Sequence, residues 1–118
     1  MTDATMTVAT LRSRVAEFVK AREWEKFHRA SNLAKAISVE AAELLELFQW
    51  RAEAEALDLP LRARAAEELA DVVIYCLSAA NSLDLDLSET VLRKLERDEA
   101  KYPVAEWRGR ARDASRDA

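Results

Sequence analysis

The sequence predicts an all-α protein, a four-helix bundle, from its composition and from the spacing of its apolar residues. The 118 residues include one glycine and two prolines, too few for the tight turns of a β-sandwich or β-barrel. Alanine occurs 23 times, and leucine, glutamate and arginine, which also favour helices, are abundant. The length suits one domain, which we expect over residues 1–118 with its core at about 8–103.

The first helix is expected over residues 8–24, where apolar side chains recur at helical spacing. A short polar connection precedes the second helix, which is expected to run to about Ala54. Ser31 and Asn32 are the candidates for its N-cap, because either side chain can accept a hydrogen bond from a free backbone N–H. Pro60 disfavours helical geometry at the residue before it, so we expect a break over residues 58–61.

The third helix is expected over residues 62–82. Between Leu69 and Leu83 its only charged residue is Asp71. A helix that is apolar nearly all round is normally buried inside a bundle. We therefore expect the long helices to assemble with a second copy of the chain, which would cover the apolar faces that one copy leaves in water.

The fourth helix is expected to begin at Ser88 as its N-cap. Leu87 and Leu92 then occupy the two positions of a hydrophobic staple around that cap. Pro103 ends or kinks this helix, because proline cannot donate the backbone hydrogen bond that a helix interior requires. Residues 104–118 are expected to form a frayed or short helical tail.

Charge and apolar patterning exclude several classes of partner. Eighteen basic and 22 acidic residues give a net charge of −4, whereas a dedicated nucleic-acid binder usually carries a basic footprint. No run of about 18 apolar residues is free of charge, so we expect no membrane span, and the first ten residues lack the pattern of a signal peptide. The single cysteine, Cys76, is expected to fill space in the core. The sequence therefore predicts a cytoplasmic protein.

Four carboxylates fall on faces that are otherwise apolar. At about 100° per residue, Glu40 lies in the middle of the apolar arc of the second helix, and Glu43 lies at its edge. Asp71 interrupts the apolar third helix, with Glu68 one turn before it on the same side. A buried carboxylate without a partner costs several kcal/mol, so these four acids require partners.

Two interpretations of these acids are open from the residues alone. In the first, ion pairs neutralise them, and the available bases include Lys35, Arg51 and Lys94. In the second, the two helices bring four acids into a cluster that repels itself unless a cation is bound. Because all the ligands are oxygens, the metal would be Mg²⁺ or Mn²⁺ rather than zinc.

The sequence also resembles a known family. Glu40-Ala-Ala-Glu43, followed after 24 residues by Glu68-Leu-Ala-Asp71, is similar to the ExxE…ExxD signature of the MazG-like nucleoside triphosphate pyrophosphohydrolases. Further segments resemble the dCTP pyrophosphatase branch of this family, over about residues 8–103. These are Arg22-Glu23-Trp24, Phe27-His28, Asn32-Leu33, Glu43 to Trp50, Asp71 to Tyr75, Lys94, and Lys101-Tyr102-Pro103.

The resemblance implies an all-α enzyme, a dimer or dimer of dimers, that hydrolyses a nucleoside triphosphate to the monophosphate and pyrophosphate with Mg²⁺. It makes Glu40, Glu43, Glu68 and Asp71 the metal ligands and catalytic acids. A surplus carboxylate, Glu43 or Glu46, would orient the attacking water or take its proton. The sequence does not decide between them.

The resemblance also implies substrate contacts. Lys94 and Lys101 would face the phosphates, and Trp24, Trp50 and Tyr75 would form a base pocket that favours dCTP and related pyrimidines. His28 or Asn32 would add a polar contact to the base, unless each ties down the loop or caps the helix instead. The remaining residues assigned to substrate binding are Asp98 and Tyr102.

The chain departs from the family pattern at two positions. Asp98 stands where close relatives often carry asparagine, so an extra carboxylate lies near the phosphates and metal. Val15 stands where some relatives have histidine near the base, which is expected to broaden the base preference.

Two other classes of protein compete with this one. A di-iron bundle needs two Glu-x-x-His motifs, and the chain supplies one, which ends at its only histidine, His28. A non-enzymatic helical adaptor would gain nothing from placing Glu40 and Asp71 on apolar faces.

Overall fold

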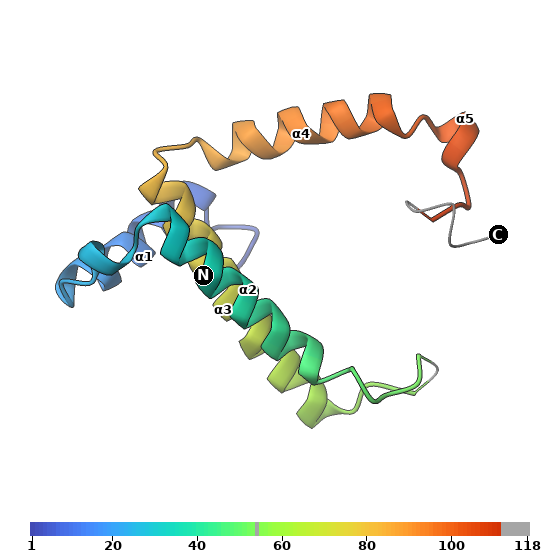
Figure 1. Ribbon diagram of the computed structural model, residues 1–118, viewed down its shortest axis with the longest axis horizontal. Coiled ribbons are helices and arrows are strands. Elements are labelled where there is room, and N and C mark those ends of the chain that lie inside the picture. Colours follow the sequence, from blue (N-terminus) through green and yellow to red (C-terminus); the bar gives the residue numbers. More distant parts are fainter. Residues whose placement is uncertain (54, 112–118) are drawn as a thin grey trace. The chain divides into compact units, whose positions relative to one another are not determined.

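The computed structural model describes residues 1–53 and 55–111, and within these ranges the chain is helical with no strand (Figure 1). It divides into two compact units, Met1–Leu85 and the part from Asp86 onward. The all-α prediction is therefore confirmed. None of the helices in the described ranges is long and apolar enough to cross a membrane.

The first unit contains α1 (Val8–Ala21), the short 3₁₀-helix η1 (Glu25–Phe27), α2 (Ala30–Glu46) and α3 (Leu59–Ser82). Helices α2 and α3 lie side by side and run in opposite directions, and α1 packs against α3 (Figure 1). The core is small, and its most deeply buried large side chain is Leu33, at 1% exposure. The other buried apolar residues are Val19, Leu61, Leu77 and Ala80.

Helix α1 ends three residues before the predicted end, for a local reason. Glu23 adopts a left-handed conformation, with φ of 54°. The N–H of Trp24 then donates to the carbonyl of Val19 at 3.1 Å, and that of Glu23 donates to Lys20 at 3.0 Å. This pair of bonds is the Schellman motif, which satisfies the last free carbonyls of a helix.

The predicted N-cap of α2 is wrong. The helix begins at Ala30, after Arg29 in extended conformation, and no side chain caps it. Asn32 instead donates its amide N–H to the carbonyl of Phe27 at 3.2 Å, so it ties down the preceding turn. At the other end α2 stops at Glu46 and tightens into turns, while the predicted end, residue 54, lies outside the described residues.

Pro60 does not break the chain where the sequence predicts. Helix α3 already begins at Leu59, because Asp58 accepts a hydrogen bond from the N–H of Leu61 at 2.8 Å and forms the N-cap. Pro60 therefore lies in the first helical turn, where its missing N–H has no intrahelical partner to lose.

Helix α3 is not buried all round within this unit. Leu69, Val73 and Ile74 are 53%, 43% and 43% exposed. Cys76 is half-buried rather than fully enclosed. One copy of the unit therefore leaves part of its most apolar helix uncovered.

The second unit contains α4 (Leu87–Lys101) and the short α5 (Val104–Trp107). The predicted cap at Ser88 is wrong, and with it the staple between Leu87 and Leu92. Asp86 is the N-cap, because its carboxylate accepts from the N–H of Glu89 at 2.9 Å.

The end of α4 near Pro103 is as predicted. Beyond it, α5 forms one short helical turn, which agrees with the expected short helical tail. The tail from residue 112 lies outside the described part of the chain.

Candidate metal centre

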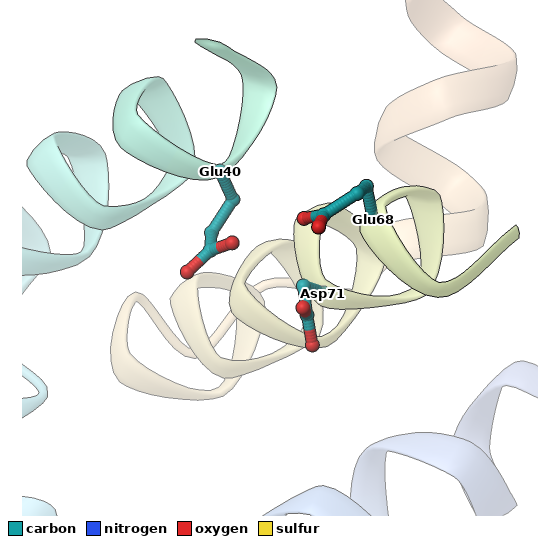
Figure 2. A group of neighbouring side chains, drawn as sticks. All are labelled: Glu40, Glu68 and Asp71. Atoms are coloured by element: carbon teal, nitrogen blue, oxygen red, sulfur yellow. The ribbon is translucent and has the colours of Figure 1, made fainter. Parts of the chain in front are cut away.

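Three of the four predicted acids come together between α2 and α3. Glu40 extends from α2 toward α3, which carries Glu68 and Asp71 (Figure 2). Each of the three offers one carboxylate oxygen, and these oxygens lie within 4.8 Å of one another. The sequence positions them because residues three apart share one side of a helix, and the packing of α2 on α3 supplies the third acid.

Two acids of this group each have a buried oxygen without a hydrogen-bond partner in the described ranges. Glu40 and Glu68 are half-buried, and the Oε2 atom of each is buried with no hydrogen-bond donor. Of the bases considered as partners within the first unit, Arg51 pairs with Glu55, and Lys35 forms no ion pair with these acids among the described residues. The ion-pair interpretation therefore finds no support here, and a cation remains the natural partner.

The electrostatics of the group also favour a bound cation. The carboxyl of Glu43 raises the pKa of Glu40 above its ordinary value, with burial as the second cause. Burial raises the pKa of Glu68, and Glu43 adds to the effect. Glu43 thus interacts with two of the three acids, although it lies outside the closest group of oxygens. Within the first unit, negative charge therefore accumulates at this group.

An all-oxygen donor set of this kind fits a hard divalent cation. Mg²⁺ prefers carboxylate oxygens and keeps several water ligands. The two unpartnered Oε2 atoms would gain a ligand from such an ion, and the charge that raises both pKa values would be neutralised. The residues present therefore fit Mg²⁺ or Mn²⁺.

Stability of the metal-free chain is expected to fall as the pH rises above the ordinary pKa of glutamate. Glu40 and Glu68 hold protons more tightly when folded, so the folded state binds more protons than the unfolded state in this window. Urea midpoints measured from about pH 4 to about pH 8 should show the loss, with Mg²⁺ restoring stability at the upper end. Glu40→Gln should flatten the curve, and an unchanged slope in that variant would contradict the prediction.

The aromatic residues predicted to form the base pocket do not stack on one another. The ring of Trp24 packs edge-on against Phe18, with centroids 5.9 Å apart. Tyr75 lies beside His28, with ring centroids 6.2 Å apart. Trp50 follows the end of α2 and is 89% exposed. Within the first unit, the three rings therefore have different neighbours and different exposures.

The residues assigned to phosphate binding lie in the second unit. Lys94 forms an ion pair with Asp98 one turn later on α4. The ammonium of Lys101 lies 5.4 Å from the ring centroid of Tyr102, which packs edge-on against Trp107 at 5.0 Å. Sequence reasoning gave Trp107 no role, although it helps to order this end of the unit.

Sequence reasoning also missed Ser78. This residue is 5% exposed, and its hydroxyl has no hydrogen-bond partner among the described residues. The available signal was the same one that singled out Asp71, a polar side chain within the apolar stretch of the third helix.

Together, the fold and the site define a helical protein with an acidic centre, built from two antiparallel helices, that suits a divalent metal. The MazG-like family matches residues 35–115, and the chain belongs to this family. The resemblance seen in the sequence is thereby confirmed. Membership, and the absence of His28 from the acid group in the described ranges, speak against the di-iron alternative.

Curated relatives and a solved structure are similar to the chain. It is 40% identical to dCTP pyrophosphatase 1 of Rattus norvegicus over 109 residues, covering 89% of this chain and 64% of that protein. It is 40% identical to dCTP pyrophosphatase 1 of Homo sapiens over 102 residues, covering 83% and 60%. The chain thus spans somewhat less than two thirds of the length of these relatives. A crystal structure of a pyrophosphatase from Archaeoglobus fulgidus superposes with a TM-score of 0.70 at 39% identity, covering 77% of this chain and 87% of that one.

Proposed function

We propose that the chain is a Mg²⁺-dependent hydrolase of nucleoside triphosphates, with pyrimidine deoxynucleotides, dCTP first, as its substrates. The observation that carries this proposal is the group of three carboxylate oxygens within 4.8 Å, two of whose residues have a buried unpartnered oxygen. The similarity to proteins named dCTP pyrophosphatase supports the substrate. The products are the nucleoside monophosphate and pyrophosphate, and the whole chain acts as one MazG-like domain.

Each acid has a role in this reaction. Glu40, Glu68 and Asp71 would hold the metal, which supplies charge neutralisation for the triphosphate and activation of water. Glu43, beside Glu40 and Glu68, orients the attacking water and accepts its proton. The water oxygen bonds to the α-phosphorus, the bond from that phosphorus to the bridging oxygen breaks, and pyrophosphate leaves. Glu43 is favoured over Glu46 because it interacts with Glu40 and Glu68.

The other residues that we assign to the substrate are lysines, an aspartate and aromatic residues. Lys94 and Lys101 bind the phosphates, and Asp98 orients Lys94 through their ion pair. Trp24, Trp50, Tyr75 and Tyr102 provide the aromatic surfaces for the nucleoside.

We further propose that two or four copies assemble. Support comes from an apolar groove of about 680 Å³ between α1 and α3. Phe18, Val73 and Ile74 line it and are 48%, 43% and 43% exposed. Apolar surface gathered in one place usually marks an interface.

Among triphosphates, dCTP and its 5-substituted forms are expected to have the highest specificity constants in a pyrophosphate-release assay. Trp50→Ala should weaken pyrimidine binding, by about tenfold if one stacking contact is lost, because base stacking contributes about 1–3 kcal/mol. Mg²⁺ affinity measured by calorimetry should stay unchanged in this variant. A higher specificity constant for dGTP or ATP than for dCTP would contradict the pyrimidine assignment. Failure of the wild-type chain to bind Mg²⁺ would favour the adaptor.

A further inference from the structure

Two ion pairs of the same spacing lie on α4 in the second unit. Glu89 pairs with Arg93 in the first half of the helix, and Lys94 pairs with Asp98 in the second half. The partners are four residues apart in each case, so both pairs lie along the surface of the helix. The two pairs can be compared directly, because they have the same chemistry but the opposite order of acid and base along the chain.

Neither pair on α4 joins two elements of the structure. In the first unit, by contrast, Arg12 on α1 donates from Nε to the side-chain oxygen of Asn81 on α3, at 3.0 Å. The amide nitrogen of Asn81 donates back to the carbonyl of Arg12, at 3.1 Å. Those two bonds connect two helices, whereas an ion pair within one exposed helix contributes little to stability, because water screens both charges. The pairs on α4 therefore serve either the helix itself or a ligand.

The order of Glu89 and Arg93 suits the helix, whereas the order of Lys94 and Asp98 does not. Glu89 lies in the first turn, where the positive end of the helix dipole attracts an acid, and its base follows it. Asp98 lies in the last turn, near the negative end of the dipole, and its base precedes it. The helix thus gains less from the pair of Lys94 and Asp98, so its own stability does not explain this pair.

Asp98 also has the more enclosed surroundings of the two acids. Its side chain is 35% exposed, compared with 57% for Glu89. It lines a pocket of about 310 Å³ together with Tyr102, Trp107 and Arg110. The guanidinium of Arg110 lies 5.1 Å from the ring centroid of Trp107 in this lining. Asp98 is therefore a carboxylate among cations, with one base a turn before it and another in the lining of the same pocket.

We propose that Asp98 competes with the substrate's phosphates for the ammonium of Lys94, and thereby lowers the affinity of the chain for triphosphate and for the released pyrophosphate. The inference rests on the proposed function, in which Lys94 binds the phosphates. A carboxylate and a phosphate oxygen are both anions, and they repel each other when they share one ammonium. The pair that orients Lys94 in the free chain therefore opens when a phosphate binds, and it closes again when pyrophosphate leaves.

Calorimetry with inorganic pyrophosphate at saturating Mg²⁺ tests this competition without requiring turnover. Asp98→Asn removes the charge, keeps the shape of the side chain, and should tighten pyrophosphate binding about fivefold, the effect of removing one like charge close to an anion at the protein surface. Glu89→Gln is the matched control, because it removes the same charge and an ion pair of the same spacing from the same helix. It should leave the affinity unchanged. No gain in Asp98→Asn, or an equal gain in both variants, would overturn the proposal.

A double-mutant cycle shows whether Asp98 acts through Lys94. In a Lys94→Met background, Asp98→Asn should change the affinity for pyrophosphate by less than a factor of about two, because no ammonium is left to release. A fivefold gain in that background would overturn the proposal, since Asp98 would then repel the phosphates directly. Circular dichroism should show the same helix content for Asp98→Asn as for the wild type. A loss of helix with no gain in affinity would show that the pair is structural, which would also overturn the proposal.

Kinetics with dCTP separate this proposal from the proposed function. Asp98→Asn should lower KM and the inhibition constant of pyrophosphate, each about fivefold, with a smaller change in kcat. A chain that hydrolyses dCTP but shows unchanged KM and inhibition in this variant overturns the competition alone. A chain that binds pyrophosphate as expected, but hydrolyses none of the triphosphates, overturns the proposed activity and leaves Lys94 and Asp98 as a pyrophosphate-binding site.

Discussion

Glu40→Ala and Asp71→Ala are each expected to lower pyrophosphate release about a thousandfold, equivalent to about 4 kcal/mol. Either change removes one of the three oxygens that lie within 4.8 Å. The helical fold should persist, and the metal-free variants should be as stable as the wild type or more stable, because one charge leaves a cluster that repels itself. Steady-state kinetics at saturating Mg²⁺ and circular dichroism measure the two effects.

Glu67→Ala is the matched control for these variants. Glu67 is an exposed glutamate on α3, adjacent to Glu68 and outside the three-oxygen group. Its replacement should leave turnover within a factor of about two, as for most surface substitutions. Loss of helical structure in Glu40→Ala or Asp71→Ala would instead indicate that the acids serve as structural ion pairs.

Ile74→Asp is expected to dissociate the assembly. Ile74 lines the apolar groove between α1 and α3 and is 43% exposed in a single copy. A charge buried in an interface without a partner costs several kcal/mol, so the dissociation constant should rise about a thousandfold. Light scattering at micromolar concentration should give an oligomer for the wild type and a monomer for the variant.

Ser13→Asp introduces the same charge on the opposite side of α1 from the groove and should leave the assembly intact. A wild-type chain that is monomeric at micromolar concentration would contradict the prediction.

The acid group could be located from the sequence, because a carboxylate on an otherwise apolar helix face is costly to bury and therefore indicates a partner. Glu40 and Asp71 interrupt apolar arcs, and the structure brings them together with Glu68. The helices themselves were predictable for a related reason, since apolar spacing averages over many residues. The predicted ends were less accurate, because each depends on a single cap. Asp86 rather than Ser88 begins α4, and Asp58 begins α3 before Pro60.

One cavity of the first unit could not be predicted in the same way. This cavity of about 240 Å³ is lined by α1, the segment of η1 and α3, and His28 and Ser78 line it together only because α1 packs against α3. The sequence marks Ser78 as a polar residue in an apolar stretch, but it does not show that its hydroxyl lacks a partner, whereas that of Ser38 donates to the carbonyl of Ala34 at 3.0 Å. Hydrogen-bond satisfaction is a property of the tertiary structure.

The paired bonds between Arg12 and Asn81 have a consequence for the order of folding. They join residues 69 positions apart, whereas α2 and α3 need only the short connection between them to meet. Because the entropy lost on closing a loop grows with its length, we expect the α2–α3 hairpin to form early and α1 to dock late. During synthesis on the ribosome, we therefore expect α1 to dock only after the last turn of α3 has emerged. The group of Glu40, Glu68 and Asp71 can form before this step, because α2 and α3 alone carry it.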